Sequence, residues 1–235
     1  MIPAPKNHSA LPWILLLAIL AVCLVCLVCA MGGTGVYLLS RSANASRAAG
    51  SPVSPSSDPD AGRRAGNANA KVVVEEFADF QCPYCGQFHA KGEPRLRTEY
   101  IQRGKVLFIF RNYPVLDGGD TSGESHLAAL GALCAGEQGK FWEYHDTLFE
   151  NQAGENSGGF AAPHLLSFAK TLGLNGSRFD QCVQTKRYES VLDGDIRLGE
   201  NRNLQGVPTF FINGTMMLGF DDAAFFSAID NALNQ

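Results

Sequence analysis

The apolar residues of this chain form one long block near its start and shorter, patterned runs from residue 71 onward. Leu11 to Met31 contains no charged residue and consists largely of Leu, Ile, Val, Ala and Cys. A membrane-spanning helix needs about 20 apolar residues, whereas the apolar core of a cleavable signal peptide has about 7–15. The pattern therefore predicts a short tail at 1–10 and a retained transmembrane helix within 11–39. An Ala-x-Ala sequence within residues 42–45 leaves cleavage as the alternative.

Small and polar residues dominate the next segment, residues 40–70, which is rich in Ser, Ala, Gly, Pro and Asn. Such a composition buries too little apolar surface to order itself. We therefore predict a flexible linker over 40–70, in which Arg63 and Arg64 are solvated charges. Residues 71–235 then form one domain, which is long enough for a single hydrophobic core.

The pattern within that domain alternates between strand and helix. Lys71–Phe77 is a β-branched run that predicts a buried strand, and residues 104–114 predict a second one. Between them Pro83 suits the first turn of a helix that continues to about residue 102, because its missing N–H costs nothing there. Residues 121–203 predict a long helical region with breaks near the glycines at 154–159 and 173–176. Within it, residues 124–152 show the 3.6-residue apolar period of packed helices.

A hairpin and a helix complete the predicted domain. Asn213-Gly214 separates two strand-like runs, which is the strongest short-range hairpin signal. A last helix is predicted over residues 221–233. Strands that alternate with helices indicate an α/β fold, and the terminal hairpin makes its sheet mixed.

Charge narrows the choice of partners. Residues 71–235 contain 14 Lys and Arg against 21 Asp and Glu, a formal charge of −7. A nucleic-acid-binding domain would carry a basic patch, so this balance argues against a nucleic-acid partner.

Two cysteines, Cys82 and Cys85, flank Pro83-Tyr84 at the start of the first predicted helix. A structural zinc site wants four ligands, and His89 could supply only a third, so we expect no metal. At a helix N-terminus the free N–H groups and the helix dipole favour a thiolate, which is the form that attacks disulfides. The spacing therefore favours a redox pair, with Cys82 as the exposed nucleophile and Cys85 as its resolving partner.

The segment FADFQCPYCGQFH, followed far downstream by GVPTFFING, resembles the DsbA family of thioredoxin-fold disulfide oxidoreductases. The resemblance covers residues 71–235 and includes ALCAGEQGKFWEYHDTLFENQ in the helical block. It implies a thioredoxin-like mixed sheet with an inserted helical domain. It also implies a cis Val207–Pro208 bond that faces the redox pair and binds an extended substrate. No cofactor beyond the redox-active disulfide is then expected. The best-known oxidases of the family carry Pro-His where this chain has Pro83-Tyr84, so the oxidising strength stays open.

The resemblance also suggests roles for three further residues. Strand alternation puts Glu76 on one face with Val72 and Val74, where the family often has a buried acid that could relay a proton to the resolving cysteine. Glu75 is the competing candidate. Related proteins carry a second disulfide in the helical block, which suggests a structural bond between Cys134 and Cys182.

The sequence thus predicts an extracytoplasmic oxidoreductase that passes its disulfide to reduced exported proteins. A quinone-linked membrane oxidase of the DsbB or VKOR type would restore it, and the cell membrane of a bacterial envelope would be its location. The alternatives are a reductase or isomerase with the same residues, and a non-catalytic metal-binding or substrate-holding module. One prediction conflicts with the charges: Arg41 and Arg47 against Lys6 mildly favour a cytoplasmic domain.

Overall fold

The computed structural model describes residues 61–235, and the sheet at its centre is built from the two predicted strands rich in β-branched and aromatic residues. β2 (Val72–Ala78) and β3 (Val106–Asn112) pair in parallel. β4 (Thr209–Ile212) lies antiparallel on the other side of β2, and β5 (Thr215–Leu218) follows it. Among the described residues the strand order is β1-β3-β2-β4-β5, so the predicted mixed sheet is confirmed.

The turn between β4 and β5 has the conformation that its sequence predicts. Asn213 and Gly214 have φ angles of 46° and 84°, the left-handed region that this kind of two-residue turn requires. The Asn213 side chain also accepts a hydrogen bond from the Val73 N–H at 2.8 Å. The turn is therefore tied to the start of β2 as well as to its own hairpin.

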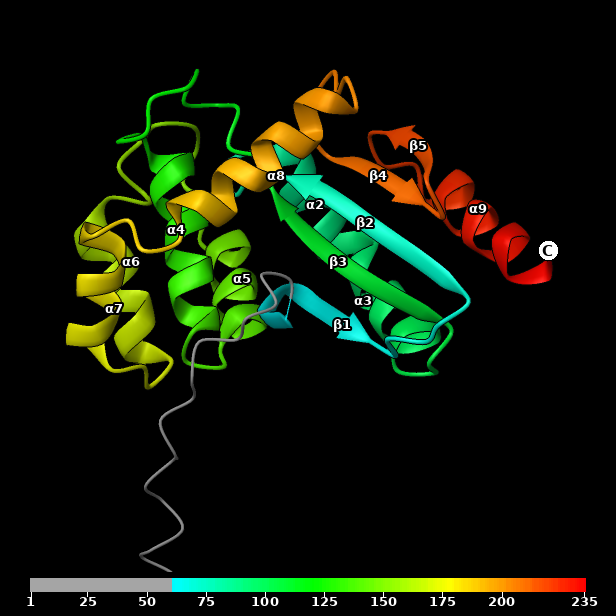
Figure 1. The fold of residues 1–235 in the computed structure, drawn as a ribbon, viewed down its shortest axis with the longest axis horizontal. Coiled ribbons are helices and arrows are strands. Elements are labelled where there is room, and N and C mark those ends of the chain that lie inside the picture. The colour runs from blue at the N-terminus through cyan, green and yellow to red at the C-terminus, as the bar shows by residue number, and fades with distance from the viewer. Residues whose placement is uncertain (1–60) are drawn as a thin grey trace, which may run out of the picture. The chain divides into compact units, whose positions relative to one another are not determined.

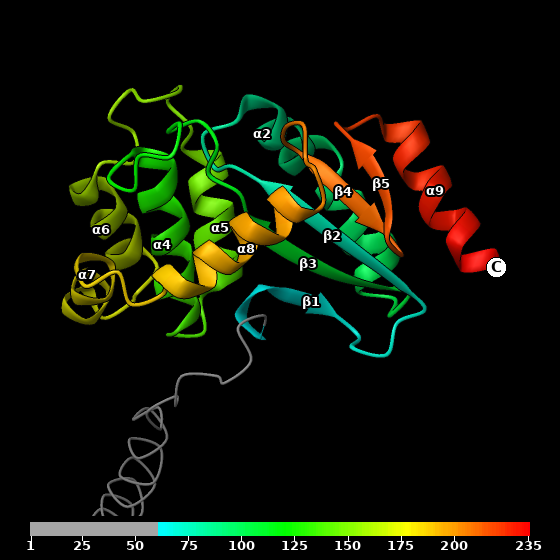
Figure 2. The same ribbon diagram turned by 45° about the horizontal axis from the view of Figure 1, so that its top comes forward.

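Helices cover both faces of the sheet (Figures 1 and 2). One face packs against the helix that follows β2 and against the C-terminal helix, through a core that includes Phe88, Phe210 and Phe225. α8 crosses the other face (Figure 2). The first helix is nearly continuous to Ile101, close to its predicted end, with a break at Gly92. These helices are α2 (Pro83–Lys91), α3 (Glu93–Arg95), the π-helical η2 (Leu96–Ile101), α8 (Glu189–Asn201) and α9 (Asp222–Asn234).

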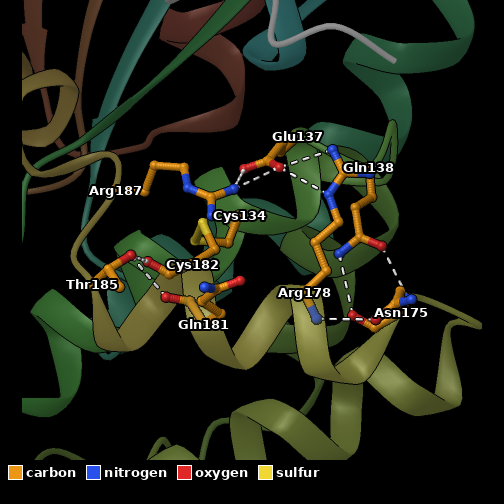
Figure 3. The surroundings of a disulfide bond; sticks show 9 residues. All are labelled: Cys134, Glu137, Gln138, Asn175, Arg178, Gln181, Cys182, Thr185 and Arg187. Atoms are coloured by element: carbon orange, nitrogen blue, oxygen red, sulfur yellow. Dashed lines mark hydrogen bonds and ion pairs between the residues drawn. A yellow bond between two sulfur atoms is a disulfide. The ribbon is translucent and has the colours of Figure 1, made fainter. Parts of the chain in front are cut away.

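Four further helices lie between β3 and α8, within the range predicted for the inserted block. They form a separate layer beside the sheet (Figure 1). A disulfide joins Cys134 on the first to Cys182 on the last, and Glu137 binds Arg178 and Arg187 close to it (Figure 3). The four helices are α4 (Glu124–Gly136), α5 (Phe141–Glu150), α6 (Ala162–Thr171) and α7 (Gly176–Gln184).

The prediction that the linker extends to residue 70 is wrong. A short 3-10 helix, η1 (Ala61–Arg63), leads into β1 (Arg64–Gly66), which pairs antiparallel with β3 at one edge of the sheet. Arg63 is only 2% exposed and binds Asp195 of α8, so it is not a solvated charge. The pairing with β3 and the buried ion pair together supply the order that the local composition does not.

The predicted tail, transmembrane helix and first part of the linker, residues 1–60, lie outside the described residues. Within residues 61–235 we find no helix with the length and apolar character that a membrane crossing requires.

Candidate active site

The redox pair stands at the start of α2, where the chain leaves β2. Cys82 is the N-cap residue of the helix, in an extended conformation, and Pro83 occupies the first helical turn as predicted. The Cys82 N–H donates to the Asp79 carbonyl at 3.0 Å, which closes the tight turn between strand and helix. Cys85 follows one turn into the helix, and both cysteines are free thiols in this structure.

The three side chains of the motif differ greatly in exposure. Tyr84 is 67% exposed, whereas Cys82 is 5% and Cys85 0% exposed. The expectation of an exposed Cys82 is therefore wrong in degree. The Val207 carbonyl lies 3.6 Å from the Cys82 sulfur, so the distant cis-proline segment covers much of it. Of the two thiols, Cys82 is still the one that solvent can reach.

The two thiols have opposite electrostatic environments. The pKa of Cys82 is lowered to about 7, first by a hydrogen bond from Cys85 and then by the backbone N–H groups of Cys85 and Tyr84, against the opposing effect of burial. The pKa of Cys85 is raised well above its usual value by burial, by its hydrogen bond to Cys82 and by the charge of Glu76. At neutral pH the arrangement therefore favours a thiolate on Cys82 and a neutral thiol on Cys85.

The structure brings the second predicted segment to the redox pair. The Val207–Pro208 peptide bond is cis, and the Val207 carbonyl faces the sulfur of Cys82. The Pro208 carbonyl in turn accepts the Gly219 N–H at 2.8 Å, which holds the segment at the end of the hairpin. The two stretches, 125 residues apart, thus form one site.

Glu76 and Glu75 point to opposite faces of β2. Glu75 pairs with Arg111 and Arg202 at 2.9 and 2.8 Å, on the face that α8 crosses. Glu76 is 1% exposed, and one of its carboxylate oxygens has no hydrogen-bond partner. Burial raises the pKa of Glu76 well above its usual value, and the charges of Glu93 and Cys82 add to this effect. Glu76 is thus the acid on the redox side, but its role in proton transfer stays a prediction.

Several polar residues of the site carry no periodic signal in the sequence. Gln81, 4% exposed, donates to the Ser125 hydroxyl at 2.7 Å, and Ser125 donates to the buried carboxylate of Asp79 at 2.6 Å. Gln152, just after α5, donates from its amide to the carbonyls of Phe80 and Cys82. Only the Gly-rich, polar composition around Gln152 marks it as part of a loop.

A charged cluster behind α2 was also missed. His89, Glu93, His145 and Asp146 each place one donor atom within 4.8 Å of the others, a grouping that could hold a metal ion. Arg97, however, already donates to both carboxylates at 2.6 Å. Its guanidinium supplies the positive charge that a metal would bring. The i, i+4 spacing of His89, Glu93 and Arg97 was a readable signal, although it would predict an exposed helix face.

Comparison with known proteins places this geometry in a family. The family model described as Thioredoxin matches residues 59–232. The chain belongs to the thioredoxin family. Within it, the chain is a DsbA-like member, by the relatives and structures that it matches. The family match begins at residue 59, so it includes η1 and β1. It therefore agrees with the finding that the linker does not extend to residue 70.

Three matches indicate how far the similarity extends. The chain is 34% identical over 157 residues to Na(+)/H(+) antiporter NhaA 3 of Salinispora tropica, which covers 67% of this chain but only 22% of that protein. It is 29% identical over 161 residues to disulfide bond formation protein D of Bacillus subtilis, which covers 67% of this chain and 70% of that one. Oxidised BdbD from Bacillus subtilis superposes with a TM-score of 0.67 at 26% identity and covers 74% of this chain and 94% of its own.

Proposed function

We propose that the protein is a membrane-anchored thiol-disulfide oxidoreductase that transfers the Cys82–Cys85 disulfide to exported proteins. The observation that carries the proposal is the opposite shift of the two thiol pKa values within one helical turn, beside the Val207 carbonyl. A lowered pKa increases the fraction of a cysteine that is present as thiolate at neutral pH, and it makes that cysteine a better leaving group. The relatives named for disulfide bond formation support the same chemistry.

The exchange has two steps in this geometry. A substrate thiolate attacks the Cys82 sulfur of the oxidised pair, the Cys82–Cys85 bond breaks, and Cys85 leaves with the electron pair. A second substrate thiolate then attacks the substrate sulfur of the mixed disulfide and releases Cys82 as a thiolate. The substrate dithiol loses two electrons and two protons. The redox pair gains both electrons and one proton, on Cys85, while Cys82 is left as a thiolate and the second proton goes to solvent.

Glu76 has the properties of a proton donor for the first step. Cys85 leaves as a thiolate but has a raised pKa, so it takes up a proton at neutral pH. Burial keeps Glu76 protonated above its usual pH range, and once Glu76 loses its proton the negative charge raises the pKa of Cys85. We therefore assign Glu76 the transfer of a proton to and from Cys85.

Substrate traps test the assignment of roles. In Cys85→Ser the Cys82 thiolate can still attack a disulfide of an exported protein, but Cys85 can no longer displace that protein, so mixed disulfides through Cys82 should accumulate. Cys82→Ser should form none and should lose exchange with a model disulfide. Traps that form equally well through Cys85 in Cys82→Ser would reverse the two roles.

One observation favours a second candidate, a reductase with the same residues. The lowered pKa of Cys82, about 7, matches that of the reactive cysteine in thioredoxin, which is also about 7. The reactive cysteine of the strongly oxidising DsbA has a pKa of about 3.5. A less stabilised thiolate makes a weaker oxidant. Equilibration of the redox pair with glutathione separates the two candidates: a potential of about −120 mV supports the oxidase, and one of about −270 mV supports the reductase.

The proposed location is the outer side of a bacterial cell membrane, with residues 1–9 inside and the domain outside. An oxidising compartment is where a bond such as Cys134–Cys182 persists. A membrane quinone-linked oxidase of the DsbB or VKOR type would then restore the redox pair. Protease added to cells stripped of any outer barrier should digest the domain. A domain that is digested only after the membrane is lysed would reverse the topology.

A further inference from the structure

The loop that carries Cys82 is held by the side chain of Gln152. Its amide nitrogen donates to the Phe80 carbonyl at 2.7 Å and to the Cys82 carbonyl at 3.0 Å. The Cys82 carbonyl also accepts the Gly86 N–H at 3.0 Å, which is the first hydrogen bond of α2. Gln152 therefore contacts the backbone on both sides of Gln81, where the strand becomes the helix.

Gly86 leaves the space that Gln152 occupies. A Cβ atom on Gly86 would lie 2.3 Å from the Gln152 Oε1 atom, and the three nearest atoms to that position all belong to Gln152. Real Cβ atoms essentially never come so close, so any side chain at position 86 would displace the amide. The packing of Gln152 therefore explains why the residue after the redox motif is a glycine.

The loop that contains Gln152 also contacts the active-site turn through Asn156. The Asn156 N–H donates to the Gln81 Oε1 atom at 2.6 Å. Residues 152 and 156 belong to the connection between α5 and α6, so the inserted helical block holds the turn through the side-chain amide of Gln152 and the backbone N–H of Asn156. A turn fixed in this way has one orientation of its peptide groups.

We propose that Gln152 is a positioning residue that holds the turn at residues 80–82 in the orientation required for Cys82 to react. The proposal rests on the proposed thiol-disulfide exchange for its biological meaning. The backbone N–H groups of Tyr84 and Cys85 stabilise the Cys82 thiolate, and they follow directly from the peptide unit that Gln152 holds. If the turn relaxes, these donors no longer point reliably at the sulfur, and the thiolate becomes less stable.

The test compares the pH dependence of Cys82 alkylation in the reduced full-length chain and its variants. Gln152→Met keeps the length of the side chain and removes both donors. It should raise the alkylation midpoint by about one pH unit, which is a tenfold loss of thiolate below the midpoint. Gly86→Ala should raise the midpoint as well, because it displaces the intact amide.

Gln138→Met is the matched control. Gln138 also joins two loops, because its side chain accepts the Asn175 N–H at 2.9 Å, but it lies in the helical block near the Cys134–Cys182 disulfide (Figure 3). This variant should leave the midpoint unchanged, whatever it does to the thermal unfolding midpoint. A purely structural role for Gln152 would give the same result as Gln138→Met.

The double variant Gly86→Ala with Gln152→Ala decides the case even if Gln152→Met does not fold. With the amide gone, the three atoms that the added methyl would meet first are removed, so Gly86→Ala should no longer change the midpoint. A folded Gln152→Met with the wild-type midpoint overturns the proposal, and so does an effect of Gly86→Ala that persists in the double variant. Alkylation needs no substrate protein, so this result is independent of whether the proposed oxidation of exported proteins is found.

Discussion

Removal of the Cys134–Cys182 disulfide should destabilise the domain by an amount that its position in the chain fixes. The bond joins residues 48 apart, and both cysteines are 1% exposed. In the chain-entropy model a closed loop of this length lowers the entropy of the unfolded chain enough to contribute about 4 kcal/mol at 25 °C. The variant Cys134→Ala with Cys182→Ala should lose about that much unfolding free energy.

The native contacts around the bond should persist in this variant. Glu137, at the end of α4, binds Arg178 and Arg187 at 2.8 Å, so α4 and α7 remain joined without the sulfurs (Figure 3). Although burial opposes it, the two arginines lower the pKa of Glu137, so this carboxylate stays ionised at neutral pH. The loss should therefore arise mainly in the unfolded state, and Cys82 should keep its alkylation rate.

Urea unfolding of the oxidised proteins, followed by tryptophan fluorescence, measures the loss. Each single variant breaks the same bond, so each should lose nearly the full amount and the double variant little more. Additive losses, or a loss below about 1 kcal/mol, would refute the loop-entropy reasoning. A clear change in Cys82 alkylation would show that the bond acts on the redox site instead.

Two further predictions concern buried charges. The folded-state pKa of Glu76 is raised, so the stability that Glu76 contributes is complete below its ordinary pKa of 4.5 and is lost as the pH rises toward the folded-state pKa. Glu76→Gln should therefore gain stability relative to wild type above pH 4.5. Stability curves of the two proteins that stay parallel over pH would contradict this. Arg63→Met should cost about 3–5 kcal/mol of unfolding free energy, measured in urea, because it leaves Asp195 buried without its main partner. The control Arg64→Met, in the exposed part of β1, should cost much less. Equal losses would refute the buried-pair argument.

Local patterns were sufficient for most elements of the fold. The β-branched runs gave β2 and β3, and Asn213-Gly214 gave the hairpin, because their signals lie within a few residues. β1 could not be found in this way. Its three residues follow a Pro-, Ser- and Gly-rich segment, and their order comes from β3 and from Asp195, which is 132 residues from Arg63.

The redox pair was readable because spacing alone carries its chemistry, whereas its surroundings were not. The low exposure of Cys82 is caused by Val207, and its turn is held by Gln152, and neither contact has a local signal. Strand alternation did place Glu76 on the buried face. It could not show that Glu75 would find Arg111 and Arg202, since that depends on how α8 crosses the sheet.

The position of β1 has a mechanical consequence for any force that reaches the domain from its N-terminal side. Such a load enters at η1 and β1 and passes first to β3, the only strand that β1 contacts within the described sheet. The buried Arg63–Asp195 pair shares this load with α8. β2, which leads into Cys82, is separated from β1 by β3. A pull on the preceding segment is therefore borne by one edge of the sheet, and the strand that leads into the redox pair lies outside the direct load path.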